Sequence, residues 1–256
     1  MSCARGGYRK TITMTTEAIS HLLDVPVRAS LTGDHARFGV RRGRVLRYKP
    51  GLATFAALPD DPEPQDWHDA AALAGPGQVL YLVGQDPELP PGWTGVSHSR
   101  GVQLVADRPV ARYDEEVRVL GFQDALEILA LVEETKPGPF LPRSLQYARY
   151  FGFRVHGELV AVAGLRMRPE GFAEVSTVCT LPEYRGRGLA RRLVMHLCRL
   201  VAQQGATPFL HAKADQEAVL RLYGSLGFEH RADLVFRQIA APRELSAYPL
   251  GGGEAS

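Results

Sequence analysis

The residues with the clearest chemical meaning lie in one stretch, residues 174–190, which reads EVSTVCTLPEYRGRGLA. Its last part, Arg185–Ala190, places two glycines directly before apolar residues at helical spacing, which continue to about Gly205. The first N–H groups of a helix have no internal partner and carry the positive end of the helix dipole. Glycines leave those groups open to a ligand, and Arg185 and Arg187 add positive charge. The pattern indicates an anion site that suits a diphosphate.

The residues around these glycines exclude two common nucleotide-binding motifs and predict the surrounding secondary structure. No Lys-Ser/Thr pair follows them and no G-x-G-x-x-G is present, which excludes a P-loop and a dinucleotide-binding fingerprint. Before them, the β-branched Val175 and Val178 predict a strand, which Pro182 ends because proline has no N–H for the sheet. We therefore expect a strand, a short turn and a glycine-rich loop that opens a long helix.

Length and composition describe an ordinary globular protein. The 256 residues suit one large domain or two small ones, with 45% hydrophobic and 23% charged residues. The net charge of +2 indicates no particular partner, so we expect neither nucleic-acid nor membrane binding. No apolar run is long enough to span a membrane, and the first residues contain no apolar signal core.

The cysteines and the amino-terminal residues indicate the compartment. Cys3, Cys179 and Cys198 are an odd number without a close pair, which indicates neither a disulfide framework nor a zinc site. We expect a reducing, cytoplasmic location and no metal. Residues 1–14 are expected to be a disordered leader, with Met14 as an alternative start.

Two halves are expected, with a boundary near residue 110. The first half is α/β or α+β without a chemical motif. Its expected elements are a helix near Thr16–Leu23, a hairpin of Arg37–Arg41 and Val45–Tyr48, a strand over Leu52–Leu58, a helix from Trp67 to Gly75, a strand over Val79–Gly84, and two short strands, Trp93–Ser97 and Val102–Ala106.

The second half alternates strands and helices more regularly. Its expected elements are a strand over Glu116–Leu120, helices over Ala125–Val132 and Ser144–Tyr150, a hairpin of Phe151–Val155 and Leu159–Leu165, the strand and long helix described above, a strand over Phe209–Lys213, a helix over Gln216–Leu226, and final strands at Phe228 and Leu234–Ile239.

Two motifs in this half resemble those of a known family. Arg185–Ala190 (RGRGLA) resembles the coenzyme A-binding motif Q/R-x-x-G-x-G/A of the GNAT superfamily of N-acetyltransferases. Asp215–Phe228 is similar to the N-x-x-A…L-Y-x-x-x-G-F ending of that family, with Gln216 in place of Asn and Val219 in place of Ala. The element order agrees over residues 114–240, half of the chain. The resemblance implies an α/β (α+β mixed sheet) GNAT fold.

The whole chain looks most like the glycine N-acyltransferase-like branch of that family. In that reading, residues 15–110 are a degenerate GNAT-like half, residues 111–240 are the catalytic domain and residues 241–256 are a flexible tail. The resemblance implies acetyl-CoA as cosubstrate. It assigns the pantetheine arm and the acyl group to Val178, Cys179 and Thr180, with a main-chain N–H near Val178 or Cys179 as oxyanion donor. It assigns a further hydrogen bond to the cofactor to Gln216. The residues that would bind the pyrophosphate are Arg185, Gly186, Arg187, Gly188, Leu189 and Ala190.

Two residues are candidates for proton transfer. The family pattern makes Tyr223 the general acid for the leaving thiolate; the alternative is a core aromatic residue. Glu174 is the candidate base, directly or through water, and the alternative is a solvated carboxylate at a strand end. Ser176 lies on the same strand face and can position water. Cys179 is not expected to be a nucleophile, because no His/Asp relay lies near it in the sequence.

The remaining polar candidates have weaker signals. His211 is expected to be a packed or hydrogen-bonded strand histidine rather than a catalytic one, and His196 is expected to be a helix-face residue. Phe140, Arg143, Arg166 and Met167 are candidates for an acceptor pocket that takes a carboxylate; the alternative is a packed loop with solvated arginines.

These residues lead to one expected activity and two alternatives. The expected activity is direct transfer of an acetyl group, in a ternary complex, to a primary amine of a small-molecule or amino-acid-like acceptor by a monomer or homodimer. One alternative is a non-catalytic acyl-CoA-binding sensor or structural protein. The other, nucleic-acid binding through residues 185–192, has only local charge in its favour.

Overall fold

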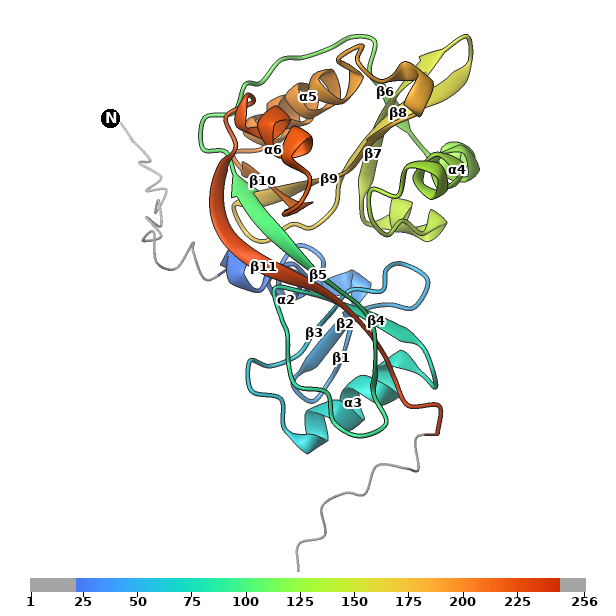
Figure 1. The fold of residues 1–256 in the computed structure, drawn as a ribbon, viewed down its shortest axis with the longest axis vertical. Helices are drawn as coiled ribbons and strands as arrows, with labels where there is room; N and C mark the ends of the chain where they lie inside the picture. Colours follow the sequence, from blue (N-terminus) through green and yellow to red (C-terminus); the bar gives the residue numbers. More distant parts are fainter. Residues whose placement is uncertain (1–21, 245–256) are drawn as a thin grey trace, which may run out of the picture.

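A computed structural model describes residues 22–244. The chain forms two lobes connected by two long strands, β5 and β11, which run from one lobe into the other (Figure 1). The expected leader, almost all of the helix near Thr16–Leu23 and most of the tail lie outside the described residues.

An eight-stranded mixed sheet organises the molecule. Its order is β4-β11-β5-β10-β9-β8-β7-β6, and β9 and β10 run parallel while the other neighbours are antiparallel. The strands are β4 (Val79–Val83), β5 (Thr94–Val105), β6 (Arg118–Leu120), β7 (Arg149–Val155), β8 (Glu158–Leu165), β9 (Phe172–Thr180), β10 (Thr207–Lys213) and β11 (Glu229–Ala240). The mixed α/β fold class is confirmed.

The amino-terminal lobe adds a small second sheet to β4. Its elements are α2 (Pro26–Thr32), η1 (Ala36–Phe38), β1 (Gly39–Arg42), β2 (Val45–Tyr48), β3 (Ala56–Ala57) and α3 (Pro64–Ala74). The expected hairpin of β1 and β2 is confirmed, as is helix α3. A capping box between Glu63 and Asp66 starts α3, and Gly75 with a φ of +89° ends it.

The prediction of two short strands at Trp93–Ser97 and Val102–Ala106 is wrong, because β5 is one continuous strand of 12 residues. Gly101 interrupted the apolar pattern in the sequence. In the structure, a Cβ at this position would come within 2.4 Å of the Phe236 ring, so the glycine accommodates that side chain of β11. The carboxy-terminal strands are likewise one element, β11, with two register shifts against β5.

Helices cover both faces of the sheet in the carboxy-terminal lobe (Figure 1). They are η2 (Phe122–Asp124), α4 (Ala125–Thr135), η3 (Pro142–Gln146), η4 (Pro182–Tyr184), α5 (Leu189–Gln203) and α6 (Glu217–Gly224). The expected helix over Ser144–Tyr150 is wrong: only the short η3 forms there. The Ser144 hydroxyl lies 3.0 Å from the Tyr150 hydroxyl and caps no α-helix.

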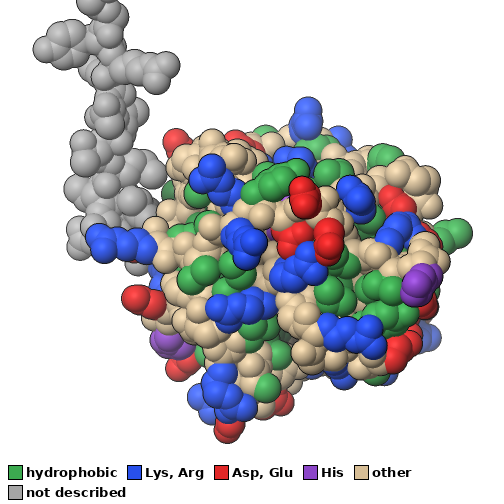
Figure 2. All heavy atoms as spheres, turned by 90° about the horizontal axis from the view of Figure 1, so that it is seen from above, with side chains coloured by type: hydrophobic (Ala, Val, Ile, Leu, Met, Phe, Trp, Pro, Cys, Tyr) green, Lys and Arg blue, Asp and Glu red, His purple; other side chains and the backbone are tan. Residues whose placement is uncertain are grey.

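Helix α5 packs against β8 and β9 through a fully buried apolar face, which includes Leu193, Val194 and Leu197. At its opposite face, residues 112–116 and α5 border a surface hollow of about 590 Å³. Seen from above, basic and acidic side chains are interspersed over the surface (Figure 2). At the hollow, Arg192 pairs with Asp114 and Glu116. Among residues 22–244, no helix combines the length and the apolar character that crossing a membrane requires.

Candidate active site

Strands β9 and β10 separate at one point of the sheet. Their parallel pairing covers only Phe172–Glu174 opposite Thr207–Phe209. Beyond that point β9 pairs only with β8, and β10 pairs only with β5. The main chain of Val178–Thr180 therefore has no strand partner on the side that faced β10. An extended ligand can use such groups as an added strand would.

A β-bulge lies just beyond the separation. Gly164 pairs with Ser176 and Val162 with Cys179, so β9 has one residue more than β8 between the two pairs. The bulge contains Thr177, whose φ of +54° is unusual for a β-branched residue. Bulges redirect the main-chain groups next to them, and backbone strain of this kind clusters at functional sites.

The glycine-rich loop next to β9 forms an open cradle. Gly186 and Gly188 both have a φ of +75°, and a Cβ at either would meet no atom within 4 Å. Gly188 precedes α5, and no side chain caps the helix. The first N–H groups of α5 are therefore available to an anion. The expected order of strand, turn, glycine loop and long helix is confirmed.

The polar groups around this cradle fit a phosphate-bearing, extended ligand. Arg185 donates from Nε to the Thr180 carbonyl at 3.3 Å, and Arg187 donates to the Glu183 carbonyl. Within the described range neither arginine forms an ion pair. The Thr180 hydroxyl is enclosed and has no hydrogen-bond partner among residues 22–244. Burying a hydroxyl without a hydrogen-bond partner costs free energy, and this one lies on β9 beside the cradle.

Tyr223 lies on α6 and faces β9. Its side chain is buried, its ring packs 5.9 Å from that of Phe228, and no described residue hydrogen bonds to its hydroxyl. Burial raises the pKa of Tyr223, and the neighbouring Cys179 raises it further. The phenol therefore keeps its proton at neutral pH and can donate it toward β9. Its role as general acid stays a prediction.

Glu174 is not solvated but completely buried at the point where β9 and β10 separate. Its carboxylate accepts from Arg166 Nε and Nη2 at 2.9 and 2.8 Å, from the Met167 N–H at 3.3 Å, and from His211 Nδ1 at 2.8 Å. The pKa of Glu174 lies far below its usual range, because the Arg166 charge and hydrogen bonds outweigh the cost of burial. The carboxylate stays ionised, and its oxygens are already engaged.

A chain of polar contacts links His211 to the other lobe. Gln103 Nε2 donates to the Leu23 carbonyl at 2.9 Å, and Gln103 Oε1 accepts from Arg231 at 2.7 Å. The Gln103 amide nitrogen lies 3.0 Å from His211 Nε2, so this ring nitrogen accepts and Nδ1–H donates to Glu174. The prediction of a hydrogen-bonded strand histidine is confirmed. No local sequence pattern predicts these contacts, because they join residues far apart in the chain.

The other predicted residues lie in different surroundings. Burial raises the pKa of the Cys179 thiol to about 12, which leaves almost no thiolate at neutral pH. Ser176 is buried and lies 3.3 Å from the Thr177 hydroxyl. Gln216 is exposed at the start of α6, and its amide has no partner within the described range. His196 is buried, and its Nδ1 accepts from the Asp114 N–H.

The four acceptor-pocket candidates separate into two groups. Phe140 and Met167 are core residues, with the Phe140 ring packed 5.1 Å from Tyr150. Arg143 and Arg166 instead lie where the lobes meet. Arg166 is stacked over the Phe55 ring of the other lobe at 4.6 Å, and Arg143 is exposed beside Gly51 of that lobe. Residues 22–244 contain no group of three or more His, Cys, Asp or Glu that could hold a metal ion.

Comparison with known proteins identifies the family of this chain. The family described as FR47-like protein matches residues 150–236, which contain the strand separation, the cradle and Tyr223. A solved structure of a putative acetyltransferase from the GNAT family of Novosphingobium aromaticivorans is 37% identical, with a TM-score of 0.78; the match covers 86% of this chain and 99% of that one. The chain therefore belongs to the GNAT family.

Two curated proteins are also similar. An uncharacterised protein of Mycobacterium leprae is 30% identical over 84% of this chain and 70% of its own length. N-alpha-acetyltransferase RimI of Mycobacterium tuberculosis is 40% identical over 83 residues, which are 31% of this chain and 51% of that protein. These similarities indicate an acyl-CoA N-acetyltransferase as the class of enzyme.

Proposed function

We propose that this protein transfers an acetyl group from acetyl-CoA to the primary amine of a small-molecule or amino-acid-like acceptor, by direct attack in a ternary complex. One observation carries the proposal: β9 and β10 separate beside the open helix start of α5, and Tyr223 faces the same strand. Main-chain hydrogen-bonding groups, an anion site and a proton donor therefore serve one ligand position.

The cosubstrate would be held by groups without protein partners. In this proposal the first N–H groups of α5, with Arg185 and Arg187, bind the diphosphate. The main chain of Val178, Cys179 and Thr180 pairs with the pantetheine arm, and the exposed Gln216 amide reaches the same ligand. Bound acetyl-CoA supplies the activated acyl thioester.

The chain's own residues would then manage charge and protons. A main-chain N–H at the bulge, at Val178 or Cys179, stabilises the developing oxyanion, and Tyr223 donates its proton to the departing sulfur. Arg166 and His211 occupy the Glu174 carboxylate, so Glu174 can take a proton from the amine only through water. Its low pKa also makes it a weak base. The proposal therefore depends more on Tyr223 than on Glu174.

The amino-terminal lobe fits a tandem arrangement. We propose that residues 15–110 are a degenerate partner of the catalytic residues 111–240, as in the glycine N-acyltransferase-like branch. The similarity to RimI covers only 31% of this chain, but it makes peptide amino termini a second group of acceptors to test. The enzyme would act as a cytoplasmic monomer or homodimer without a metal.

A second candidate function is an acyl-CoA-binding protein without turnover. The observation that favours it is the fully engaged carboxylate of Glu174, which leaves no free base at the strand separation.

Two measurements distinguish these functions. Calorimetric titration with acetyl-CoA measures binding, and release of free thiol in the presence of an amine panel measures transfer. Saturable binding with amine-dependent thiol release supports the acetyltransferase. Binding without release by any amine supports the second candidate, and absence of binding overturns both.

A further inference from the structure

A cluster of six rings from both lobes adjoins the buried pair of Arg166 and Glu174, with Phe55 stacked on Arg166 and His211 hydrogen bonded to Glu174. This aromatic ring cluster consists of Tyr48, Phe55 and Tyr81 of the amino-terminal lobe, Tyr147 and His211 of the carboxy-terminal lobe, and Phe236 of the connecting strand β11. Its ring-centre distances are 4.8 Å for Tyr147–Tyr48, 6.4 Å for Tyr48–Phe55, 5.2 Å for Phe55–Tyr81, 6.3 Å for Tyr81–Phe236 and 6.1 Å for Phe236–His211.

Three polar atoms in or beside this cluster have no hydrogen-bond partner within residues 22–244. They are Arg166 Nη1 and the hydroxyls of Tyr81 and Tyr147. None is among the enclosed polar atoms that lack a partner, so each retains contact with solvent, and both tyrosines are only partly buried. The contrast with the neighbouring phenols is clear: Tyr48 lies 2.9 Å from His35 Nδ1, and Tyr150 lies 3.0 Å from the Ser144 hydroxyl.

The free guanidinium nitrogen has a fixed direction. Nε and Nη2 of Arg166 are held by Glu174, and one face of the group lies on Phe55, so Nη1 cannot turn away. The side chain is 11% exposed. A fixed donor with access from outside suits a carboxylate or carbonyl oxygen of a ligand.

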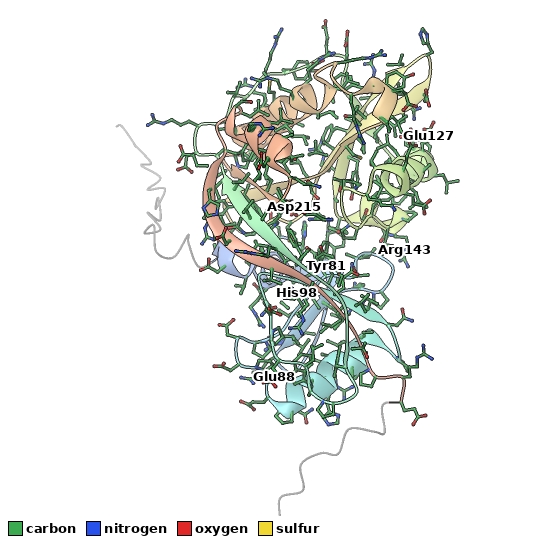
Figure 3. All side chains as sticks on the ribbon, viewed as in Figure 1. Tyr81, Glu88, His98, Glu127, Arg143 and Asp215 are labelled. Atoms are coloured by element: carbon green, nitrogen blue, oxygen red, sulfur yellow. The ribbon has the colours of Figure 1, made fainter. Side chains whose placement is uncertain are left out.

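An unpaired charge lies at the rim of the same region. Arg143 of η3 is exposed, forms no ion pair with a described residue, and lies against Gly51 of the opposite lobe. In Figure 3, Arg143 and Tyr81 both lie at the level where the lobes meet. Since Glu174 already neutralises Arg166, Arg143 supplies the positive charge that would draw in an anion.

The cluster also lies at a useful distance from the proposed reaction centre. Arg166 hydrogen bonds through its main-chain N–H to the Glu174 carbonyl, and Ser176 beside the bulge is two residues farther along β9. Two residues of a strand span about 7 Å. The cluster and the bulge are therefore neighbours along β9, and one small acceptor can contact both.

We propose that both lobes together form a carboxylate subsite for the acceptor, built from Arg166 Nη1 and the hydroxyls of Tyr81 and Tyr147, with Arg143 at its entrance. The acceptor is then an amino acid with a free carboxylate, and Tyr81 of the amino-terminal lobe helps to set this specificity. The inference rests on the proposed acetyl transfer for its activity readout, but the binding it describes can be measured without turnover.

The experiment compares each of the standard amino acids with its own carboxamide. With wild-type protein, kcat/KM for the preferred acid should exceed that for its amide at least tenfold. Tyr81→Phe and Arg143→Gln should each raise KM for the acid five- to tenfold and reduce the acid-to-amide ratio, while KM for acetyl-CoA stays the same. Tyr113→Phe and Arg199→Gln are matched controls, since these exposed residues lie away from the cluster. Equal rates for acid and amide, or variants that behave as wild type, would overturn the subsite.

A binding measurement separates this inference from the proposed function. Calorimetry with CoA-loaded protein and the same acids and amides reports the subsite even if no acetyl group is transferred. Acid-selective binding that Arg143→Gln weakens supports the subsite whether or not turnover is found. Lack of acid-selective binding overturns the subsite, and acetylation of any amine in that case leaves the proposed function standing.

Discussion

Glu174 of β9 accepts both Nε–H and Nη2–H of Arg166, at 2.9 and 2.8 Å, in a pair almost closed to solvent. The pair lies where β9 and β10 part and where Phe55 of the other lobe covers the guanidinium. One ion pair thus connects the sheet, the site and the interface between the lobes.

Glu174→Gln should destabilise the protein by about 3 kcal/mol or more, because it leaves the buried Arg166 charge without a counterion. Urea unfolding at pH 7 measures this as a lower free energy of unfolding. Glu217→Gln is the control, since its pair with Arg221 on α6 is largely exposed and contributes little. A variant as stable as wild type would show that the pair is not a structural element.

The stability difference between wild type and Glu174→Gln should depend on pH. The pKa of Glu174 is lower in the folded than in the unfolded protein, so its contribution to stability is complete above the unfolded value of about 4.3. That contribution is lost as the pH falls toward the folded pKa. The stability difference between wild type and Glu174→Gln should therefore be constant from pH 8 to about pH 6 and shrink below about pH 4. A difference that does not change down to pH 3.5 contradicts this.

Tyr223→Phe should lower kcat by about 10²-fold or more, since general acid catalysis typically contributes 10²–10⁴. Binding of acetyl-CoA should change little, because no residue in the described part of the chain hydrogen bonds to the hydroxyl. Steady-state kinetics and calorimetry on the same preparations test this, with Tyr113→Phe as the control. Full turnover by the variant would remove Tyr223 from the mechanism and leave it as a core aromatic residue.

Gly188→Ala should weaken acetyl-CoA binding at least tenfold, because the new methyl group projects into the open cradle that the diphosphate is proposed to fill. Gly205→Ala, just past the other end of α5, is a close control: its φ is +70°, and it too has nothing within 4 Å of an added Cβ. Both variants should lose about 1 kcal/mol of stability from the left-handed backbone. Equal acetyl-CoA affinity in the two would contradict the cradle.

Cys179→Ala should retain turnover within a few-fold, because a buried thiol with a pKa of about 12 cannot form an acyl-enzyme at neutral pH. Intact-protein mass spectrometry after incubation with acetyl-CoA should show no stable adduct at this residue. Cys198→Ala is the control, since burial raises the pKa of that thiol to about 12 as well. Complete loss of activity in Cys179→Ala alone would revive a covalent mechanism.

The local pattern predicted those parts of the fold that local physics determines. The helix start at Gly188, the stop at Gly75 and the strand over Phe172–Thr180 follow from glycine geometry and apolar periodicity. The local pattern divides β5 into two strands at Gly101, because only its contact with the distant Phe236 explains the glycine. The local pattern around Ser144 predicts a helix cap, whereas in the structure its hydroxyl lies 3.0 Å from that of Tyr150 on the next strand.

In the candidate site, too, local sequence predicts some residues and only the tertiary structure places the others. The cradle residues are contiguous and carry their own signal, but the bulge at Thr177 arises from the register between β8 and β9. The sequence pattern is compatible with a solvated Glu174 at a strand end. In the structure Glu174 is buried, because Arg166 and His211 of the neighbouring chain segments hydrogen bond to it. Such contacts depend on the tertiary fold, which a single sequence does not display.

The pairing of β5 also sets the order in which the protein can be completed during synthesis. β5 ends at Val105, but its two neighbours, β10 and β11, begin only at Thr207 and Glu229. At the usual 5–20 residues per second, the ribosome needs roughly 5–20 s to deliver the first of them. Throughout that time a twelve-residue strand has two open edges, so the nascent chain is more exposed to misassembly and chaperone capture than the finished enzyme.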